Sequence, residues 1–424
     1  MSNTATLSPE VRRETISAAP AQRVASLPDP ATVVRIATDA EALAAAHRLA
    51  DLFRTGAAER DRERALPWDE LDLYSASGLG AITVPRSHGG AQVSHVTLAE
   101  VFRILSVADP ALGQIPQNQF GVLGVVHQLG TPAQKRRFYH AVLAGQRLGN
   151  AGPERGTATV LHQTTRLLDT GNGLRLEGKR FYSTGALFAH WIPSRALDSE
   201  GRAVLVLVER GAAGVTVTDD WSSFGQRTTA SGSVEFSAVE VDPDNVLPVW
   251  QLAGQPGLTG PVSQLIQAAI DAGIAQAAID DMLVFVRERA RPWVDSGLTE
   301  ATDDLYIIQA VGRLQVDLHA ANEVLREAGA VLDELAAAPV TAASSARASL
   351  AVAEAKILTT EIALQASEKL FELAGSSATR AAHNLDRHWR NARTHTLHDP
   401  VRWKYHALGN YALNGVFPKR HQWN

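Results

Sequence analysis

The spacing of apolar residues changes twice along the chain and divides it into three zones. From residue 38 to about residue 146, apolar residues recur every three or four positions, which is the period of an amphipathic helix. Thr38 and Glu41 have the pattern of a helix-capping box at the start of this zone. Helix-breaking residues interrupt the pattern at Gly78-Leu79-Gly80, at Pro85 to Gly90 and at Gly130-Thr131-Pro132. The first zone is therefore predicted to be all-α.

The second zone has the period of a β-sheet. Between about Arg147 and Leu247, β-branched and alternating runs are separated by glycines. After Gly260 the chain returns to long helices rich in alanine and leucine, of which the clearest run from Val262 to Arg289 and from Ala342 to Leu373. The order α, β, α predicts an α+β protein with an N-terminal all-α domain, a middle antiparallel β domain and a C-terminal four-helix bundle.

We expect these domains to occupy residues 31–146, 147–255 and 256–424. Residues 1–30 are rich in alanine, serine and proline and lack the apolar core of a secretory signal, so a mobile N-terminal arm is expected there. No stretch of roughly 20 residues is apolar and uncharged, which argues against a membrane span. A cytoplasmic location is the resulting expectation.

Composition narrows the chemistry. The 424 residues include no cysteine, which excludes disulfides, thiolate metal ligands and thiol nucleophiles. The formal net charge is −5, so the chain has no long-range attraction for nucleic acid or for an anionic membrane. Catalysis must then depend on other side chains or on a cofactor.

Several short motifs recur in a recognisable order. They are Gly78-Leu79, Val84-Pro85, Gly89-Gly90, Gly130 to Lys135, Gly178 to Gly185 and Phe224 to Arg227. In this order and with these gaps, the chain resembles the acyl-CoA dehydrogenase fold from about residue 38 onward. The resemblance implies a flavin whose isoalloxazine ring lies between the β domain and the last helices.

The same resemblance implies which residues contact the flavin. Two strand segments, Leu148 to Ala151 and Tyr182 to Gly185, would face the ring, with Ser183 and Thr184 as polar contacts. Ordinary strand-edge hydroxyls bonded to the backbone are the alternative for both. Asn150 stands where dehydrogenases usually carry a small or hydroxyl residue, and its amide could hold a peroxide through a donor and an acceptor.

Two further segments are matched to the phosphate end of the cofactor. Arg289 falls on the family arginine that reaches a flavin phosphate, often across a subunit boundary, although with Arg287 and Arg291 alongside a solvated basic face is the alternative. The turn that contains Ser376 and Ser377 keeps one glycine where dehydrogenases commonly have two or three, which favours FMN over FAD. The resemblance also implies a homotetramer.

The stretch from Arg390 to His406 departs from the dehydrogenase pattern. Asp399 falls near the glutamate that removes the α-proton of an acyl thioester in many dehydrogenases, but Pro400 replaces the glycine turn that leaves room for the thioester. A shorter acid beside a rigid ring cannot simply inherit proton abstraction. An acyl-CoA dehydrogenase that uses FAD, with Asp399 as base, nevertheless remains an alternative.

Taken whole, the chain resembles the oxygenase branch of this fold, the two-component flavin monooxygenases of organosulfur metabolism such as dibenzothiophene monooxygenase. The residues that carry this resemblance are Thr394 to Pro400, Asn150, Asp220-Trp221, Gly225 to Arg227 and Ser231 to Ser233. It implies reduced FMN supplied by a separate NAD(P)H-dependent flavin reductase, with O2 added at flavin C4a to give a C4a-hydroperoxyflavin that passes one oxygen to a sulfur compound. By this resemblance His398 and Asn150 would hold the peroxide, Asp399 would orient His398 or contact the flavin, and Trp221 and Ser231 would lie near the pocket.

The substrate wall departs from members that oxidise bulky aromatic thiophenes. Where those carry a histidine and a tyrosine, this chain has the amide-rich stretch Gln114 to Gln119. Gln114 and Asn118 therefore suggest a smaller, more polar substrate, such as a sulfide, sulfoxide, sulfone or sulfinate.

Three other functions remain to be weighed. Amine N-hydroxylation is permitted by the same flavin chemistry. A DNA-binding relative of the fold would need a strongly basic surface, which the acidic total disfavours. His395, His398 and Asp399 could be metal ligands, but their spacing matches no helical metal motif, so no metal is expected.

Overall fold

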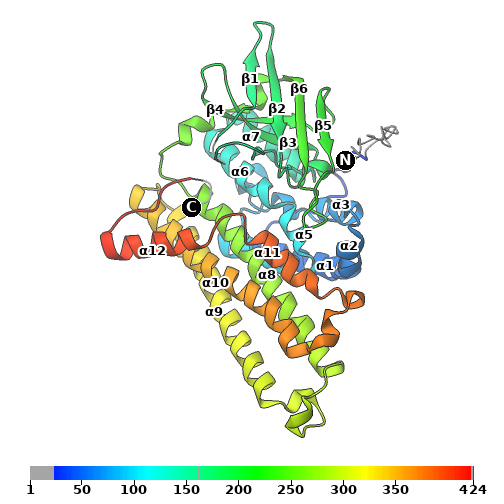
Figure 1. Ribbon diagram of the computed structural model, residues 1–424. Coiled ribbons are helices and arrows are strands. Elements are labelled where there is room, and N and C mark those ends of the chain that lie inside the picture. The colour runs from blue at the N-terminus through cyan, green and yellow to red at the C-terminus, as the bar shows by residue number, and fades with distance from the viewer. Residues whose placement is uncertain (1–22, 160–161, 422–423) are drawn as a thin grey trace, which may run out of the picture.

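The computed structural model describes residues 23–159, 162–421 and 424 (Figure 1). The arm expected over residues 1–30 lies outside the described residues as far as residue 22. The N-terminal helices are α1 (Asp39–Arg54), α2 (Ala57–Glu63), α3 (Trp68–Ala76), α4 (His95–Ala108), α5 (Pro110–Gln114), α6 (Gln117–Leu129) and α7 (Pro132–Leu143).

Side chains fix the first turns of these helices where the sequence predicts. The Thr38 hydroxyl accepts a hydrogen bond from the Glu41 amide at 3.2 Å, but the Glu41 carboxylate reaches one residue further back, to the amide of Ala37 at 2.7 Å. Before α7, Thr131 and Gln134 form the full reciprocal box. These caps satisfy backbone donors that have no partner inside the helix.

The middle zone forms one seven-stranded sheet in the order β5-β6-β2-β1-β3-β4-β7. Its strands are β1 (Arg166–Asp169), β2 (Leu174–Arg180), β3 (Trp191–Leu197), β4 (Ala203–Glu209), β5 (Val215–Thr218), β6 (Ser233–Val241) and β7 (Val246–Leu247). The prediction of an antiparallel sheet holds for every pair of neighbouring strands in the described residues except β1 and β3, which run parallel. After β2 the chain passes over β1, so β3 takes the direction of β1 and the sheet is mixed.

The C-terminal helices are α8 (Thr259–Glu288), α9 (Leu305–Ala336), α10 (Ala342–Ala374), α11 (Asp386–His395) and α12 (Arg402–Asn414). The three long helices pack together, α4 packs against α8 and α9, and α11 and α12 pack against α10. In Figure 1 the sheet lies at one end of the molecule and the long helices at the other, with α5 and α11 between them. The α+β architecture predicted from the sequence is confirmed.

One apolar core joins the three zones. Phe102 of α4, Val234 of β6 and Ile274 of α8 belong to the same cluster of buried residues. A smaller cluster, to which Phe138 of α7 and Trp191 of β3 belong, lies between the sheet and the N-terminal helices. The sheet and the bundle therefore hold α11, and the turn that follows it, in a fixed place.

Candidate active site

His398 lies in the turn between α11 and α12. Pro400 has no backbone N–H and disfavours helical geometry in the residue before it, which helps to keep residues 396–401 as a turn. The His398 Nδ1 atom lies 2.6 Å from the carbonyl oxygen of His395, and its Nε2 atom lies 2.9 Å from Nε2 of Gln114 on α5. A carbonyl oxygen only accepts, so Nδ1 donates and Nε2 accepts from the Gln114 amide. The contacts assign a neutral imidazole with hydrogen on Nδ1.

The charge state of His398 agrees with these contacts. Desolvation of the imidazole, with a smaller contribution from the nearby His395 and Lys356, lowers the pKa of His398 to about 4. The residue as a whole is nevertheless exposed to solvent, whereas its two ring nitrogens both face protein groups. His398 is thus a neutral hydrogen-bonding group at an accessible edge.

We expect His398 to stay unprotonated between about pH 8 and pH 5, because its pKa lies near 4 and not near the ordinary histidine value of about 6.5. Protonation would also set an N–H of His398 against the Gln114 amide hydrogens. Histidine NMR titration checks this, with the exposed His406 as the internal comparison. A His398 resonance that titrates near pH 6.5 would contradict the assignment.

Asp399, next to His398, points to other partners. Its carboxylate lies 3.3 Å from the Lys404 ammonium of α12, and the Gln264 amide of α8 donates to both oxygens at 3.2 and 3.3 Å once its orientation is set by its neighbours. The side chain is buried. Asp399 therefore holds the turn against α8 and α12, while Gln114 and the His395 carbonyl orient His398.

A chain of hydroxyl groups lies on the sheet side. The Thr184 hydroxyl is 2.7 Å from that of Ser231, which is 2.7 Å from that of Thr229. Thr229 then donates to the carbonyl oxygen of Gln226, which also accepts from the Trp221 indole, both at 2.9 Å. The structure thus links Thr184, Ser231 and Trp221 through hydrogen bonds within one loop region.

Asn150 lies beside the same loop region. Its amide nitrogen donates to the Tyr182 carbonyl oxygen at 3.4 Å, and its side-chain oxygen accepts from the Gly152 amide at 3.0 Å. The side chain is partly buried and joins the two strand segments predicted to face the flavin. It still has a second amide hydrogen and a second lone pair to offer.

Some buried polar atoms in this region have no hydrogen-bond partner among the described residues. They are the Ser183 hydroxyl, both polar atoms of the Gln226 amide and the side-chain oxygen of Gln114. Buried polar groups are nearly always paired in folded proteins. An isoalloxazine ring carries alternating donors and acceptors along one edge, and these unpaired atoms fit such a group.

A close backbone contact joins the loop to α11. The backbone N–H of Gln226 donates a hydrogen bond to the side-chain oxygen of Asn391 at 2.6 Å. A Cβ atom at Gly225 would lie 1.9 Å from the carbonyl oxygen of Arg390 and 2.6 Å from the Thr394 hydroxyl. Only glycine permits this approach, so Gly225 sets the spacing between the sheet-side loop and the His398 turn.

Gly225→Ala should therefore destabilise the protein by roughly 1–3 kcal/mol, because the methyl group must displace α11. Urea unfolding measures the change. Gly211→Ala is the matched control, since nothing lies within 4 Å of a Cβ at Gly211. Equal stability of the two variants would contradict the proposed spacing role.

The residues matched to the flavin phosphate lie elsewhere. Arg289 caps the far end of α8, exposed, with its guanidinium 3.4 Å from Nδ1 of His383. Ser376 and Ser377 lie in the short helix after α10. Asp271 of α8 contacts His395, which lies beside His398. Arg289 follows Asp271 by 18 residues, which is about 27 Å along a helix. Within one chain, Arg289 and His398 therefore do not form one site.

The amide-rich stretch divides in two. Gln117 donates to Ser263, and Gln119 bonds to the Gly80 carbonyl oxygen and the Leu148 amide, so both have structural partners. Gln114 contacts His398, and Asn118 is partly buried on α6. Gln114 is the member of this stretch that reaches the candidate site.

Sequence reasoning missed the charged residues beneath His398. Asp271 and Lys356 are fully buried, and Asp271 contacts His395. A signal was present for Asp271, which is an isolated charge within an apolar stretch of a long helix, whereas Lys356 has Glu354 two residues before it. Gln226 was also missed as a contributor of unpaired polar atoms.

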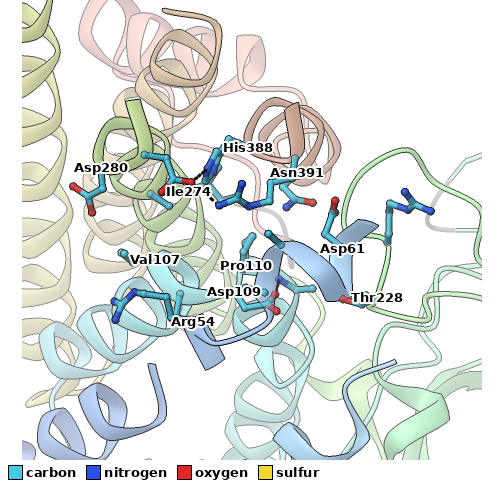
Figure 2. A pocket seen from close by; sticks show the side chains of 18 residues that line it. Arg54, Asp61, Val107, Asp109, Pro110, Thr228, Ile274, Asp280, His388 and Asn391 are labelled. Carbon is cyan, nitrogen blue, oxygen red and sulfur yellow. Dashed lines mark hydrogen bonds and ion pairs between the residues drawn. The ribbon is translucent and has the colours of Figure 1, made fainter. Parts of the chain in front are cut away.

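A separate pocket lies where α8 and α11 approach the ends of α4 and α5 (Figure 2). His388 and Asp281 pair in its wall, with His388 Nε2 2.8 Å from the Asp281 carboxylate. Of the described residues that line this pocket, none belongs to the predicted site. The pocket nevertheless borders the sheet-side loop, through Arg227, Thr228 and Asn391.

The described part of the chain has neither a membrane-spanning helix nor a cluster of metal-ligating side chains. No helix there is long and apolar enough to cross a membrane. No group of three or more histidine, cysteine, aspartate or glutamate side chains is arranged to hold a metal ion. The imidazoles of the turn are engaged with Asp271, Gln114 and a backbone carbonyl instead.

Comparisons with known proteins agree with this architecture. The family model for the acyl-CoA dehydrogenase N-terminal domain matches residues 40–146, and that for the C-terminal domain matches residues 265–403. The fold and both domains thus define a protein of the acyl-CoA dehydrogenase class, as the motifs indicated.

Among curated relatives, dibenzothiophene monooxygenase from Rhodococcus qingshengii is 32% identical over 399 residues, covering 91% of this chain and 96% of the relative. FMN-bound TdsC from Paenibacillus sp. A11-2 is 33% identical with a TM-score of 0.86, over 90% of this chain and 100% of that one. Methanesulfinate monooxygenase MsuC from Pseudomonas fluorescens is 30% identical with a TM-score of 0.83, over 90% and 99%. The chain belongs to the dibenzothiophene monooxygenase family within the acyl-CoA dehydrogenase class.

Proposed function

We propose that this protein is a two-component, FMN-dependent monooxygenase that uses reduced FMN and O2 to oxygenate a small organosulfur compound. The observation that carries the proposal is the state of the turn after α11. His398 is neutral and accessible there, while the carboxylate of Asp399 is held by Lys404 and Gln264. An acid fixed in this way is poorly placed to abstract a carbon-bound proton, which disfavours the dehydrogenase alternative.

The residues present fit a flavin ring. Ser183, Thr184 and Gln226 would bond its polar edge, with Trp221 and Asn150 beside it. Reduced flavin, when bound, supplies the two electrons that activate O2. The Nε2 atom of His398 would accept a hydrogen bond at the oxygen end in place of the one from Gln114, and Ser231 would orient Thr184. The protein must also exclude water there, so that oxygen reaches the substrate.

Two features support a small polar substrate. The Gln114 amide, which takes part in the wall next to His398, offers an unpaired oxygen to a ligand. Asn118 would extend that wall on α6. MsuC, named for methanesulfinate, shares 30% identity with this chain. We propose a sulfinate, sulfone, sulfoxide or alkyl sulfide as substrate.

Two partners follow from the proposal. Reduced FMN would come from a separate NAD(P)H-dependent flavin reductase, in keeping with the FMNH2-dependent relative SfnC of Pseudomonas putida. A homotetramer would let Arg289, with Ser376 and Ser377, reach the flavin phosphate of a neighbouring subunit. Gel filtration with light scattering tests the tetramer.

The test of the function supplies a flavin reductase, NADH, FMN and 18O2 to the protein with methanesulfinate, dimethyl sulfone, dimethyl sulfide and dibenzothiophene. One 18O atom should appear in the product of a small substrate. In the matched anaerobic assay, FAD-loaded protein is mixed with acyl-CoA thioesters. Flavin bleaching by a thioester, without any oxygenated sulfur product, would establish the dehydrogenase instead.

Arg289→Ala should weaken binding of reduced FMN by tenfold or more, because a charge-assisted hydrogen bond contributes about 1.5–3 kcal/mol. Anaerobic fluorescence titration measures the affinity. Arg287→Ala, an exposed arginine two residues earlier, is the control and should leave the affinity unchanged. Unchanged affinity in Arg289→Ala with the oligomer intact would refute its role as a phosphate ligand.

A further inference from the structure

Three charged or ionisable side chains are packed together beneath the His398 turn. Lys356 of α10, Asp271 of α8 and His395 of α11 are all fully buried. The Lys356 ammonium lies 2.5 Å from Oδ2 of Asp271, and the Thr360 hydroxyl donates to the same oxygen at 3.1 Å. The other carboxylate oxygen, Oδ1, lies 2.6 Å from Nδ1 of His395. Each oxygen of Asp271 thus has its own partner.

The contacts determine which nitrogen of His395 carries hydrogen. Burial alone would raise the pKa of Asp271, but the ammonium of Lys356 and the hydrogen bonds from His395 and Lys356 outweigh it, and the pKa is lowered. An ionised carboxylate only accepts hydrogen bonds, so Nδ1 of His395 must donate. The contacts favour a neutral His395 with Nε2 as an acceptor, because an imidazolium would bury a second N–H without a hydrogen-bond partner. Nε2 of His395 is buried and has no partner among the described residues.

His395 is also the support of His398. Its carbonyl oxygen accepts the hydrogen bond from His398 Nδ1 at 2.6 Å, and the two ring centroids are 4.8 Å apart. Both imidazoles therefore carry hydrogen on Nδ1 and present Nε2 as an acceptor. The hydrogen-bonded path runs from Lys356 through Asp271 and His395 to the turn.

We propose that Asp271, paired with Lys356, is a positioning residue for the flavin reaction. It fixes the tautomer of His395, and by anchoring His395 it also fixes the place of His398, which bonds to the His395 carbonyl oxygen. This inference rests on the proposed function. Stability alone does not explain the arrangement, because well-packed apolar residues often replace a buried ion pair without loss. A buried carboxylate that sets the tautomer of an adjacent histidine is an established way to prepare a site.

Asp271→Asn is the direct test. Lys356 and Thr360 both donate to the Oδ2 position, so the amide oxygen of the new side chain should take that place. Its NH2 group would then face Nδ1 of His395, which must accept, and the hydrogen should move to Nε2. 15N NMR of histidine-labelled protein reports which ring nitrogen carries hydrogen, and a His395→Gln variant assigns the resonance. Product formed per O2 consumed should fall about tenfold or more.

Asp281→Asn is the matched control, because Asp281 is another α8 aspartate that pairs with an α11 histidine, His388. It should alter the His388 signals and leave His395 and the product yield unchanged. Because Asp271→Asn leaves the Lys356 charge unbalanced, Lys356→Met/Asp271→Asn is examined as well. Thr360 still orients the amide in that variant, so the same tautomer exchange is expected.

The outcomes separate the two proposals. Hydrogen that stays on Nδ1 of His395 in both Asp271 variants would overturn the positioning role. An exchange of tautomer with unchanged product yield would overturn its relevance to the reaction. If the wild-type protein oxygenates no sulfur compound, the proposed function fails, while the NMR result still decides whether Asp271 sets the tautomer.

Discussion

His398→Ala is expected to separate oxygen consumption from product formation. The variant should still bind reduced FMN and consume O2, but the oxygen should leave as hydrogen peroxide. Loss of one hydrogen bond at the reacting oxygen costs about 3 kcal/mol, so product formation should fall by ~100-fold. The measurement is hydrogen peroxide released per product formed.

Two comparisons make this result specific. His406→Ala removes an exposed histidine of α12 and should remain coupled. Asp399→Asn should weaken the turn through Lys404 and Gln264 but should not abolish chemistry. The oxygenase assignment of the turn fails if His398→Ala stays fully coupled, or if Asp399→Asn alone abolishes an acyl-CoA-dependent reduction of the flavin.

Lys356→Met should lower the free energy of unfolding by about 3–5 kcal/mol, because it leaves the carboxylate of Asp271 buried without its cationic partner. Lys356→Met/Asp271→Leu removes both charges and should be more stable than the single variant. The urea midpoint and slope give the change. Lys369→Met, which removes a partly exposed lysine of the same helix, should cost much less, because its ion pair with Glu372 lies at the surface.

The pH dependence of the pair has a definite sign. The pKa of Asp271 is lowered in the folded protein, so its ionisation contributes stability that is complete above the unfolded carboxyl pKa of about 3.9. That contribution is lost as the pH falls from there toward the folded value. The difference in free energy of unfolding between the wild type and Lys356→Met/Asp271→Leu should therefore shift against the wild type as the pH falls below about 3.9. A difference that stays the same at low pH would contradict this. An equally large cost for the Lys369→Met control would contradict the burial argument.

Much of the architecture could be predicted because it follows from local patterns. The change of period from helical to two and back gave the order of the layers, and the glycine and proline breaks marked helix ends such as Thr131. The parallel pairing of β1 with β3 could not be predicted, because it depends on how the chain passes over β1, and no residue pattern records that path.

The site was predicted in part for a similar reason. Thr184, Ser231 and Trp221 could be matched to family motifs, and the structure joins them through Gln226. The partners of His398 could not be named, because Gln114 is 284 positions away along the chain. The family resemblance implied that Asp399 orients His398 or contacts the flavin, but it could not name Lys404 and Gln264, which hold its carboxylate.

The single apolar core has a consequence for how the chain can be divided. Phe102, Val234 and Ile274 come from three zones of the sequence but share one cluster, so a fragment that lacks any zone would expose apolar surface that the intact chain buries. Such a fragment would be prone to aggregation through that exposed surface. The boundaries proposed near residues 146 and 255 separate layers of topology, not units that could be expressed alone.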